Sequence, residues 1–315
     1  MTTSRSRGAR GGAGRYAPSP SGDLHLGNLR TAVLAWVLAR STDRRFVLRI
    51  EDIDRVRPGA AGRQLEDLAR LGLDWDGEPL LQSTREAEHR AVVGRLTAAG
   101  LTYECYCTRR EIQAAAGAPH GAPGVYPGTC RELSAAERSR RRRDRPPALR
   151  LRADVSSLTV ADRWAGAVAG AVDDFVLLRN DGRPSYQLAV VLDDAHQGVD
   201  QVVRGDDLLP STPRQAHLAG LLGLPEPEWA HVPLVLNPEG KRLAKRDGAV
   251  TLAELAAAGH GPAEVMGWIG LSLRLPGRVR TAQDVLAVFD EDVLPREPWL
   301  VDPSRWTGQP AGRTS

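Results

Sequence analysis

The sequence of 315 residues contains little cysteine and no long apolar segment. Three cysteines are too few for a disulfide scaffold, and an odd number cannot pair completely within one molecule. No run approaches the roughly 18 apolar residues that a membrane-spanning helix needs. The first residues, 1–14, are rich in arginine and glycine and contain no apolar stretch that could form the core of a signal peptide. We therefore expect a cytoplasmic protein with no membrane partner and with a disordered basic tail.

The rest of the composition is typical of a globular protein. Hydrophobic residues make up 42% of the chain, which is enough for one large domain or two moderate ones. The formal net charge is only +3, but arginine is concentrated in the N-terminal tail and in residues 138–145. Two interpretations of the second cluster are open: a solvated helix face, which is the more common case, or a contact with an RNA backbone.

The pattern of apolar residues predicts an α/β fold with a doubly wound, Rossmann-type parallel sheet. Residues 16–18 and 45–50 have the character of strands, and residues 29–40 between them have the character of a helix, which is a βαβ beginning. The other expected elements are helices over residues 62–71, 83–99, 211–222, 251–258 and 262–273, and strands over residues 171–178 and 186–194.

Changes in composition predict the domain organisation. Glycine and proline crowd residues 117–128 and arginines follow them, which indicates an insertion outside the sheet. The predicted parts are a tail at 1–14, the first half of the Rossmann-type domain at 15–104, the insertion at 105–147, the second half at 148–250, a short helical C-terminal part at 251–302 and a second tail at 303–315.

Two distant segments point to a nucleotide. The segment from His25 to Asn28 places an imidazole, a glycine and unpaired backbone N–H groups before a predicted helix, where phosphate binds readily. A Cβ at Gly27 would obstruct the approach of the nucleotide to the backbone. About two hundred residues later, the basic segment from Arg242 to Arg246 could close over the same phosphates. Taken alone, such a histidine is usually structural and such a basic segment is usually a surface turn, but together they indicate a nucleotide site.

These two segments resemble the nucleotide signatures of class I aminoacyl-tRNA synthetases. The flanking strings RYAPSP from Arg15, LRIEDID from Leu48 and VVRGDDLL from Val202 narrow the resemblance to the glutamyl group, and it covers roughly residues 14–268. The resemblance implies activation of a carboxylate by ATP with Mg²⁺. Attack then occurs at the α-phosphorus and pyrophosphate leaves, so the protein orients the reactants and stabilises phosphate charge without a side-chain nucleophile.

The resemblance also implies which residues contact ATP. Lys245 would place a point charge on the leaving phosphates. The family usually has a lysine where Arg242 stands and a serine or threonine where Ala244 stands, so we expect the loss of a hydroxyl ligand to slow loop closure. The complete implied set is His25, Gly27, Asn28, Arg242, Lys245 and Arg246.

Glutamate offers two carboxylates and one ammonium group, and the resemblance places five suitable side chains around it. Charge complementarity assigns Glu51 to the α-ammonium, Arg15 with Tyr186 to the side-chain carboxylate, and Arg204 to the other carboxylate, although the two arginines could exchange roles. The fifth residue is Ser19. The alternative for both arginines is an ordinary ion pair with a nearby aspartate.

Cys105, Cys107 and Cys130, together with Tyr126, bring three thiols and a phenol into the predicted insertion. Four such ligands suit one tetrahedral zinc ion. The alternatives are His120 or water as the fourth ligand, three buried cysteines without a metal, and a redox-active pair. The order Cys, Cys, Tyr, Cys resembles the glutamyl-queuosine tRNA(Asp) synthetases, which puts Tyr126 ahead of His120.

Only about seventy residues follow Lys245, and we expect no room there for the helical anticodon-binding region of a glutamyl-tRNA synthetase. The resemblance to glutamyl-queuosine tRNA(Asp) synthetases implies that L-glutamate is activated by ATP without tRNA and transferred to the queuosine base in the anticodon loop of tRNA(Asp). One alternative is a shortened glutamyl-tRNA synthetase that charges tRNA(Glu). Another is a non-catalytic paralogue that binds RNA or a nucleotide. We expect a monomer.

Overall fold

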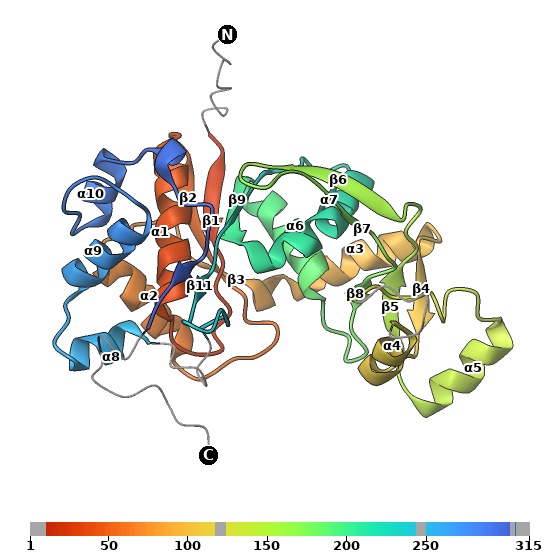
Figure 1. Ribbon diagram of the computed structural model, residues 1–315. Helices are drawn as coiled ribbons and strands as arrows, with labels where there is room; N and C mark the ends of the chain where they lie inside the picture. Colours follow the sequence, from red (N-terminus) through yellow and green to blue (C-terminus); the bar gives the residue numbers. More distant parts are fainter. Residues whose placement is uncertain (1–10, 117–123, 244–249, 303–305, 307–315) are drawn as a thin grey trace, which may run out of the picture. The chain divides into compact units, whose positions relative to one another are not determined.

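The computed structural model describes residues 11–116, 124–243, 250–302 and 306 (Figure 1). The chain divides into two compact units, and each is assembled from segments that are distant in sequence. The first unit comprises Met1–Leu81, Gln197–Leu209 and Pro227–Ser315, and the second comprises Gln82–His196 and Pro210–Glu226. The domain ranges predicted from the sequence stay predictions.

The first unit is built on five parallel strands, which confirms the predicted α/β class. Their spatial order is β3 (Leu80–Leu81), β2 (Arg45–Ile50), β1 (Ala13–Tyr16), β9 (Val199–Gly205) and β10 (Glu228–Val232). Because these strands are parallel, their carboxyl ends share one edge, where ligands bind in open α/β sheets. Apolar side chains of four of the strands form a buried cluster made of Ala13, Val47, Val199, Val202 and Trp229.

Helix α1 (Leu26–Arg40) packs on this sheet and is buried over most of its length. A Cβ at Gly14 in β1 would lie only 2.7 Å from the Cβ of Ala39, so glycine allows strand and helix to approach closely. The helix begins three residues before the predicted start at residue 29, because His25 caps it.

A short helical C-terminal part completes the first unit, as predicted. Its elements are α8 (Leu252–Ala257), α9 (Pro262–Ser272), α10 (Ala282–Ala287) and η4 (Glu291–Val293). Helix α2 (Ala60–Arg70), which follows β2 in the chain, also belongs to this unit. Two short strands, β11 (Val235–Leu236) and β12 (Trp299–Leu300), pair in parallel. Among the described residues, no helix has the length and apolar character that crossing a membrane requires.

The second unit combines antiparallel strands with helices. Strands β4 (Thr102–Cys105), β5 (Ala148–Leu151) and β8 (Val176–Leu178) form one sheet, and β6 (Ser157–Asp162) and β7 (Gly166–Ala171) form a hairpin. The helical segments are η1 (Gln82–Arg85), α3 (Glu86–Ala98), α4 (Arg109–Ala116), α5 (Ala135–Asp144), α6 (Tyr186–Gln197), η2 (Asp206–Ser211) and α7 (Thr212–Leu221), of which α6 and η2 run across the unit boundaries. A buried apolar cluster that includes Leu96, Leu151, Leu177, Leu188 and Leu218 forms the core.

The strand predicted over residues 186–194 is wrong, because this segment forms helix α6. Ser185 begins the helix: its hydroxyl accepts a hydrogen bond from the backbone N–H of Leu188 at 3.3 Å. Most of the side chains that follow are buried, so the segment has no polar face from which a helical period could be recognised.

Even a carboxylate of α6 is buried among protein groups. Asp193 has no exposed surface, and its Oδ1 lies 2.7 Å from Nε of Arg85 and 2.8 Å from Nε2 of His89. Its Oδ2 accepts a hydrogen bond from Gln82 at 2.9 Å. This network explains how an acidic residue can stand on an inward face, since a buried carboxylate needs such partners.

Candidate active site and metal site

His25 holds the N-terminus of α1 through a reciprocal pair of hydrogen bonds. Its Nδ1 accepts from the backbone N–H of Asn28 at 3.3 Å, and its own backbone N–H donates to Oδ1 of Asn28 at 3.2 Å. Because Nδ1 is the acceptor, the neutral ring carries its proton on Nε2. A Cβ at Gly27 would lie 3.1 Å from Cε1 of this ring, so glycine makes room for the imidazole.

The surroundings keep His25 uncharged. Burial, reinforced by the positive charge of Arg242, lowers its pKa to about 4. Protonation of Nδ1 would also remove the acceptor that caps the helix. At neutral pH the side chain is therefore a neutral Nε2–H donor at the positive end of a helix dipole.

The two flanks of the predicted basic loop are anchored in this unit. On one side, Arg242 forms a β-bridge with Leu236 and an ion pair with Asp207. On the other side, the backbone carbonyl of Val250 accepts a hydrogen bond from the N–H of Leu26 at 3.0 Å. Thr251, the next residue, forms a β-bridge with His25. No local pattern in the sequence predicts this second contact, which joins residues more than two hundred positions apart.

Three other members of the predicted loop, Ala244, Lys245 and Arg246, lie outside the described residues. Their roles stay predictions. The described residues on either side of them, Arg242 and Val250, both belong to the unit that contains His25.

Three of the residues predicted to bind glutamate stand on, or directly after, three neighbouring parallel strands, toward their carboxyl ends. Arg15 in β1 is buried, and its Nη1 donates to the carbonyl oxygen of Val203 in β9 at 3.1 Å, next to Arg204. Glu51 directly follows β2, and its N–H donates to the carbonyl of Pro18 at 3.0 Å. The segments that follow β1 and β2 are thereby joined, and the three charged side chains share one edge.

Ser19 lies in the same region and is exposed. Its carbonyl oxygen accepts a hydrogen bond from the side chain of Gln64 at 3.1 Å, which fixes the backbone of the turn. Tyr186 lies in the second unit, where it begins α6 and is 38% exposed. Its role toward glutamate stays a prediction.

His231 is a partner that sequence reasoning missed. Strand pairing places it beside Arg204, and its Nε2 accepts a hydrogen bond from Nε of Arg204 at 2.9 Å. The guanidinium carbon of Arg204 also lies 5.1 Å from the centre of the Trp229 ring. These contacts orient the arginine, and only knowledge of the strand order could have revealed them.

The predicted metal ligands converge in the second unit. The Sγ atoms of Cys105, Cys107 and Cys130 lie within 4.8 Å of one another. The hydroxyl of Tyr126 lies 3.3 Å from Sγ of Cys105 and 3.7 Å from Sγ of Cys107. Three thiols and one phenol at such separations fit the donor set of a tetrahedral zinc site. The alternative ligand His120 lies outside the described residues.

Burial controls the protonation of this cluster. Burial, followed by the electrostatic effect of Cys105, raises the pKa of Cys107, and burial together with the hydrogen bond between Cys105 and Tyr126 raises the pKa of Tyr126. Burial also acts to raise the pKa of Cys130, but hydrogen bonds from the backbone of Tyr106 and from Tyr126 outweigh it and lower that pKa. A metal ion bound here must therefore displace protons.

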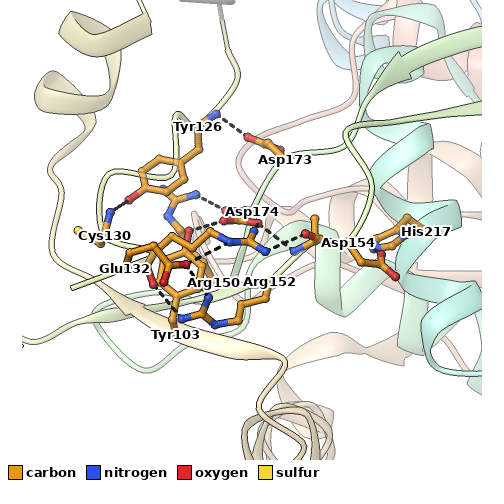
Figure 2. A network of polar contacts seen from close by, with 12 residues as sticks. Tyr103, Tyr126, Cys130, Glu132, Arg150, Arg152, Asp154, Asp173, Asp174 and His217 are labelled. Carbon is orange, nitrogen blue, oxygen red and sulfur yellow. Dashed lines mark hydrogen bonds and ion pairs between the residues drawn. The ribbon is translucent and has the colours of Figure 1, made fainter. Parts of the chain in front are cut away.

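An acidic pair holds the ligand segment in place, as Figure 2 shows. Asp173 accepts a hydrogen bond from the backbone N–H of Tyr126 at 2.6 Å. It also pairs with Arg214 at 2.5 Å. Asp174 accepts from the hydroxyl of Tyr103 at 2.7 Å and pairs with Arg131 at 2.5 Å. Sequence reasoning missed this pair, although two adjacent acidic residues inside an apolar stretch were a usable signal.

Three comparisons with known proteins agree with this description. Residues 13–276 match the family tRNA synthetases class I (E and Q), catalytic domain. The glutamyl-Q tRNA(Asp) synthetase of Nocardia farcinica (strain IFM 10152) is 64% identical over 292 residues, which are 92% of this chain and 93% of that protein. The protein of the same name from Cutibacterium acnes (strain DSM 16379 / KPA171202) is 53% identical over 274 residues, 85% of this chain and 78% of that protein.

The fold is also similar to a solved structure. A glutamate tRNA ligase from Elizabethkingia meningosepticum CCUG26117, crystallised in complex with its amino acid, superposes with a TM-score of 0.78 at 25% identity, and the match covers 93% of this chain and 67% of that protein. This likeness agrees with the more similar relatives. The chain therefore belongs to the glutamyl-Q tRNA(Asp) synthetases, ligases within the class I aminoacyl-tRNA synthetase family.

Proposed function

We propose that this protein activates L-glutamate with ATP, in the absence of tRNA, and transfers it to the queuosine base in the anticodon loop of tRNA(Asp). The observation that carries the proposal is the contact between Val250 and Leu26, which joins a residue after the basic segment to the start of α1. The names of the relatives point to the same acceptor. We further infer that the protein works as a cytoplasmic monomer.

The ATP phosphates and their Mg²⁺ would lie at the N-terminus of α1. There the helix dipole and Nε2–H of His25 favour negative charge, while the backbone N–H groups of Leu26 and Asn28 already donate to Val250 and to His25. Lys245, Arg242 and Arg246 would add positive charge from the loop as pyrophosphate leaves. Because His25 is neutral, it donates a hydrogen bond without exchanging a proton with the substrate.

Glutamate would bind at the carboxyl edge of the sheet. Glu51 would hold the α-ammonium group, Arg15 with Tyr186 the side-chain carboxylate, and Arg204 the α-carboxylate. His231 accepts from Nε of Arg204 and so directs the remaining guanidinium N–H groups away from itself. Orientation of the reacting carboxylate is the contribution that these residues make to the rate.

Cys105, Cys107, Tyr126 and Cys130 would hold one zinc ion. An ion with four protein ligands has no open coordination position, so its contribution would be structural. Its role would be to fix the segments that follow β4 and precede α5, and no step of the reaction needs to pass through it.

Transfer of labelled glutamate tests the proposal. Purified protein with ATP would be incubated with tRNA(Asp) that carries queuosine, with tRNA(Asp) that lacks it, and with tRNA(Glu). We expect label only on the first. Label on tRNA(Glu) would identify a shortened glutamyl-tRNA synthetase, and no label despite ATP binding would identify a non-catalytic paralogue. Glutamate-dependent pyrophosphate exchange without tRNA tests the activation step separately.

A further inference from the structure

Helix α5 and the residue after it carry six arginines, and most of them point toward the rest of their unit. Four of the six are spaced by three or four residues and therefore share one face of the helix. The contacts of this inner face are Arg138 to the carbonyl of Leu133 at 2.8 Å, Arg141 to Sγ of Cys130 at 3.9 Å, Arg142 to Glu104 at 2.5 Å, and Arg145 to the carbonyl of Tyr106 at 3.1 Å.

The remaining two arginines, Arg140 and Arg143, form an outer face. Both are exposed, and neither makes an ion pair or a side-chain hydrogen bond with any described part of the chain. Like charges at this spacing repel each other and cost a few tenths of a kcal/mol in helix stability. Among the described residues, the outer face therefore adds no hydrogen bond or ion pair to the fold, in contrast to the inner face.

The surrounding segment is strongly cationic. Residues 102–152 contain eleven arginines and five acidic residues, a net charge of +6, whereas the whole chain has a net charge of only +3. Four of the acidic residues are already engaged: Glu104 with Arg142, Glu111 with Arg145, Glu132 with Arg152, and Glu137 with Ser134. Arg140 has an electrostatic interaction with Glu137, but no ion pair or side-chain hydrogen bond of the described residues holds Arg140 or Arg143, and the segment keeps its net positive charge.

We propose that the outer face of α5, formed by Arg140 and Arg143, binds the phosphate backbone of the tRNA substrate. This inference rests on the proposed function. RNA is the occupant because a guanidinium group binds phosphate through two parallel hydrogen bonds, and because an exposed cationic face on a segment of net positive charge is complementary to a polyanion. The inner face adds rigidity, since the contact of Arg141 with Cys130 joins the RNA-binding helix to the predicted metal site.

The test is the affinity for queuosine-containing tRNA(Asp) across a series of salt concentrations. For the double variant Arg140→Gln/Arg143→Gln we expect binding about 10-fold weaker at physiological salt, and a slope of log affinity against log salt that is smaller by about 1 to 2. The matched control is Arg70→Gln/Arg95→Gln, which removes the same charge from exposed positions in the last turns of α2 and α3. The control should bind as the wild type does.

Pyrophosphate exchange without tRNA should be unchanged in both double variants, which verifies that they fold. Wild-type affinity and slope in the Arg140/Arg143 variant would overturn the inference, and so would an equal loss in the control. Arg140→Lys/Arg143→Lys keeps the charge but not the paired hydrogen bonds, and we expect affinity between those of the wild type and the glutamine variant. If the wild type neither binds nor modifies the tRNA, the proposed function fails as well, and the two failures are thereby distinguished.

Discussion

The guanidinium carbon of Arg150 lies 3.6 Å from the centre of the Tyr126 ring, so a buried cation stacks on the phenol that we predict to bind zinc (Figure 2). Nη1 of Arg150 donates to the carbonyl of Asp174 at 2.8 Å, which fixes the stack. Three thiolates and a phenolate around Zn²⁺ would leave an excess of negative charge in a buried place. Arg150 and Arg141 supply opposite charge there, and such outer partners strengthen metal binding.

Replacement of Arg150 by methionine should weaken zinc binding. The variant Arg150→Met keeps an apolar stem but removes the charge, and we expect the zinc affinity to fall by about 10- to 100-fold, as for other partners of metal ligands. Competition with a chromogenic chelator measures it. Arg152→Met is the control, because Arg152 stacks on Tyr103 at 5.1 Å instead of on a predicted ligand. Equal zinc affinity in the two variants would contradict the role of Arg150.

The identity of the fourth ligand can be decided with two variants. Tyr126→Phe removes only the hydroxyl that lies near Cys105 and Cys107. If Tyr126 is the ligand, the cobalt-substituted variant should change its visible absorption, because a four-coordinate ion loses one protein donor. His120→Ala should leave the spectrum unchanged. The reverse pattern would make His120 the fourth ligand.

His25 should remain neutral well below the usual pH of histidine titration. Its pKa is about 4, lowered by burial and by Arg242. Folding therefore favours the neutral form, and the stability linked to it is present above pH 6.5 and is lost as the pH falls toward 4. NMR titration of labelled histidine, with the signal assigned through His25→Asn, measures this. A midpoint near 6.5 for the assigned signal would show that the ring is not held as described.

The sequence predicted best those features that depend on neighbouring residues. Helix α1 and strand β2 follow from local apolar patterns, and the cysteines lie close together in sequence as well as in space. Helix α6 was predicted as a strand because its apolar residues follow one another without a break and are buried on more than one side, so its period carried no information.

The partners of the site residues were harder to predict, because they come from distant strands and turns. His231 meets Arg204 only through the pairing of β9 with β10, and Arg150 reaches Tyr126 from β5. No local sequence pattern predicts contacts between residues of different strands. Composition can suggest that a charged residue is buried, but the strand order decides which group it contacts.

Gly27→Ala should separate function from stability. Alanine favours a helix by about 1 kcal/mol over glycine, so the variant should be no less stable in its helical backbone. Its Cβ, however, would lie 3.1 Å from Cε1 of His25 and 3.3 Å from the Cβ of Val235, so the imidazole must move. We expect the KM for ATP in pyrophosphate exchange to rise about 3- to 10-fold.

The control for this prediction is Gly62→Ala, near the start of α2, where an added Cβ would meet no atom within 4 Å. It should raise the melting temperature and leave the KM for ATP unchanged, because it gains helix propensity without displacing a neighbour. If Gly27→Ala behaves like this control, the imidazole does not need the space that glycine leaves, and the assignment of His25 to the phosphates loses its geometric basis. If only Gly27→Ala raises the KM, the position of the His25 ring is what the nucleotide requires.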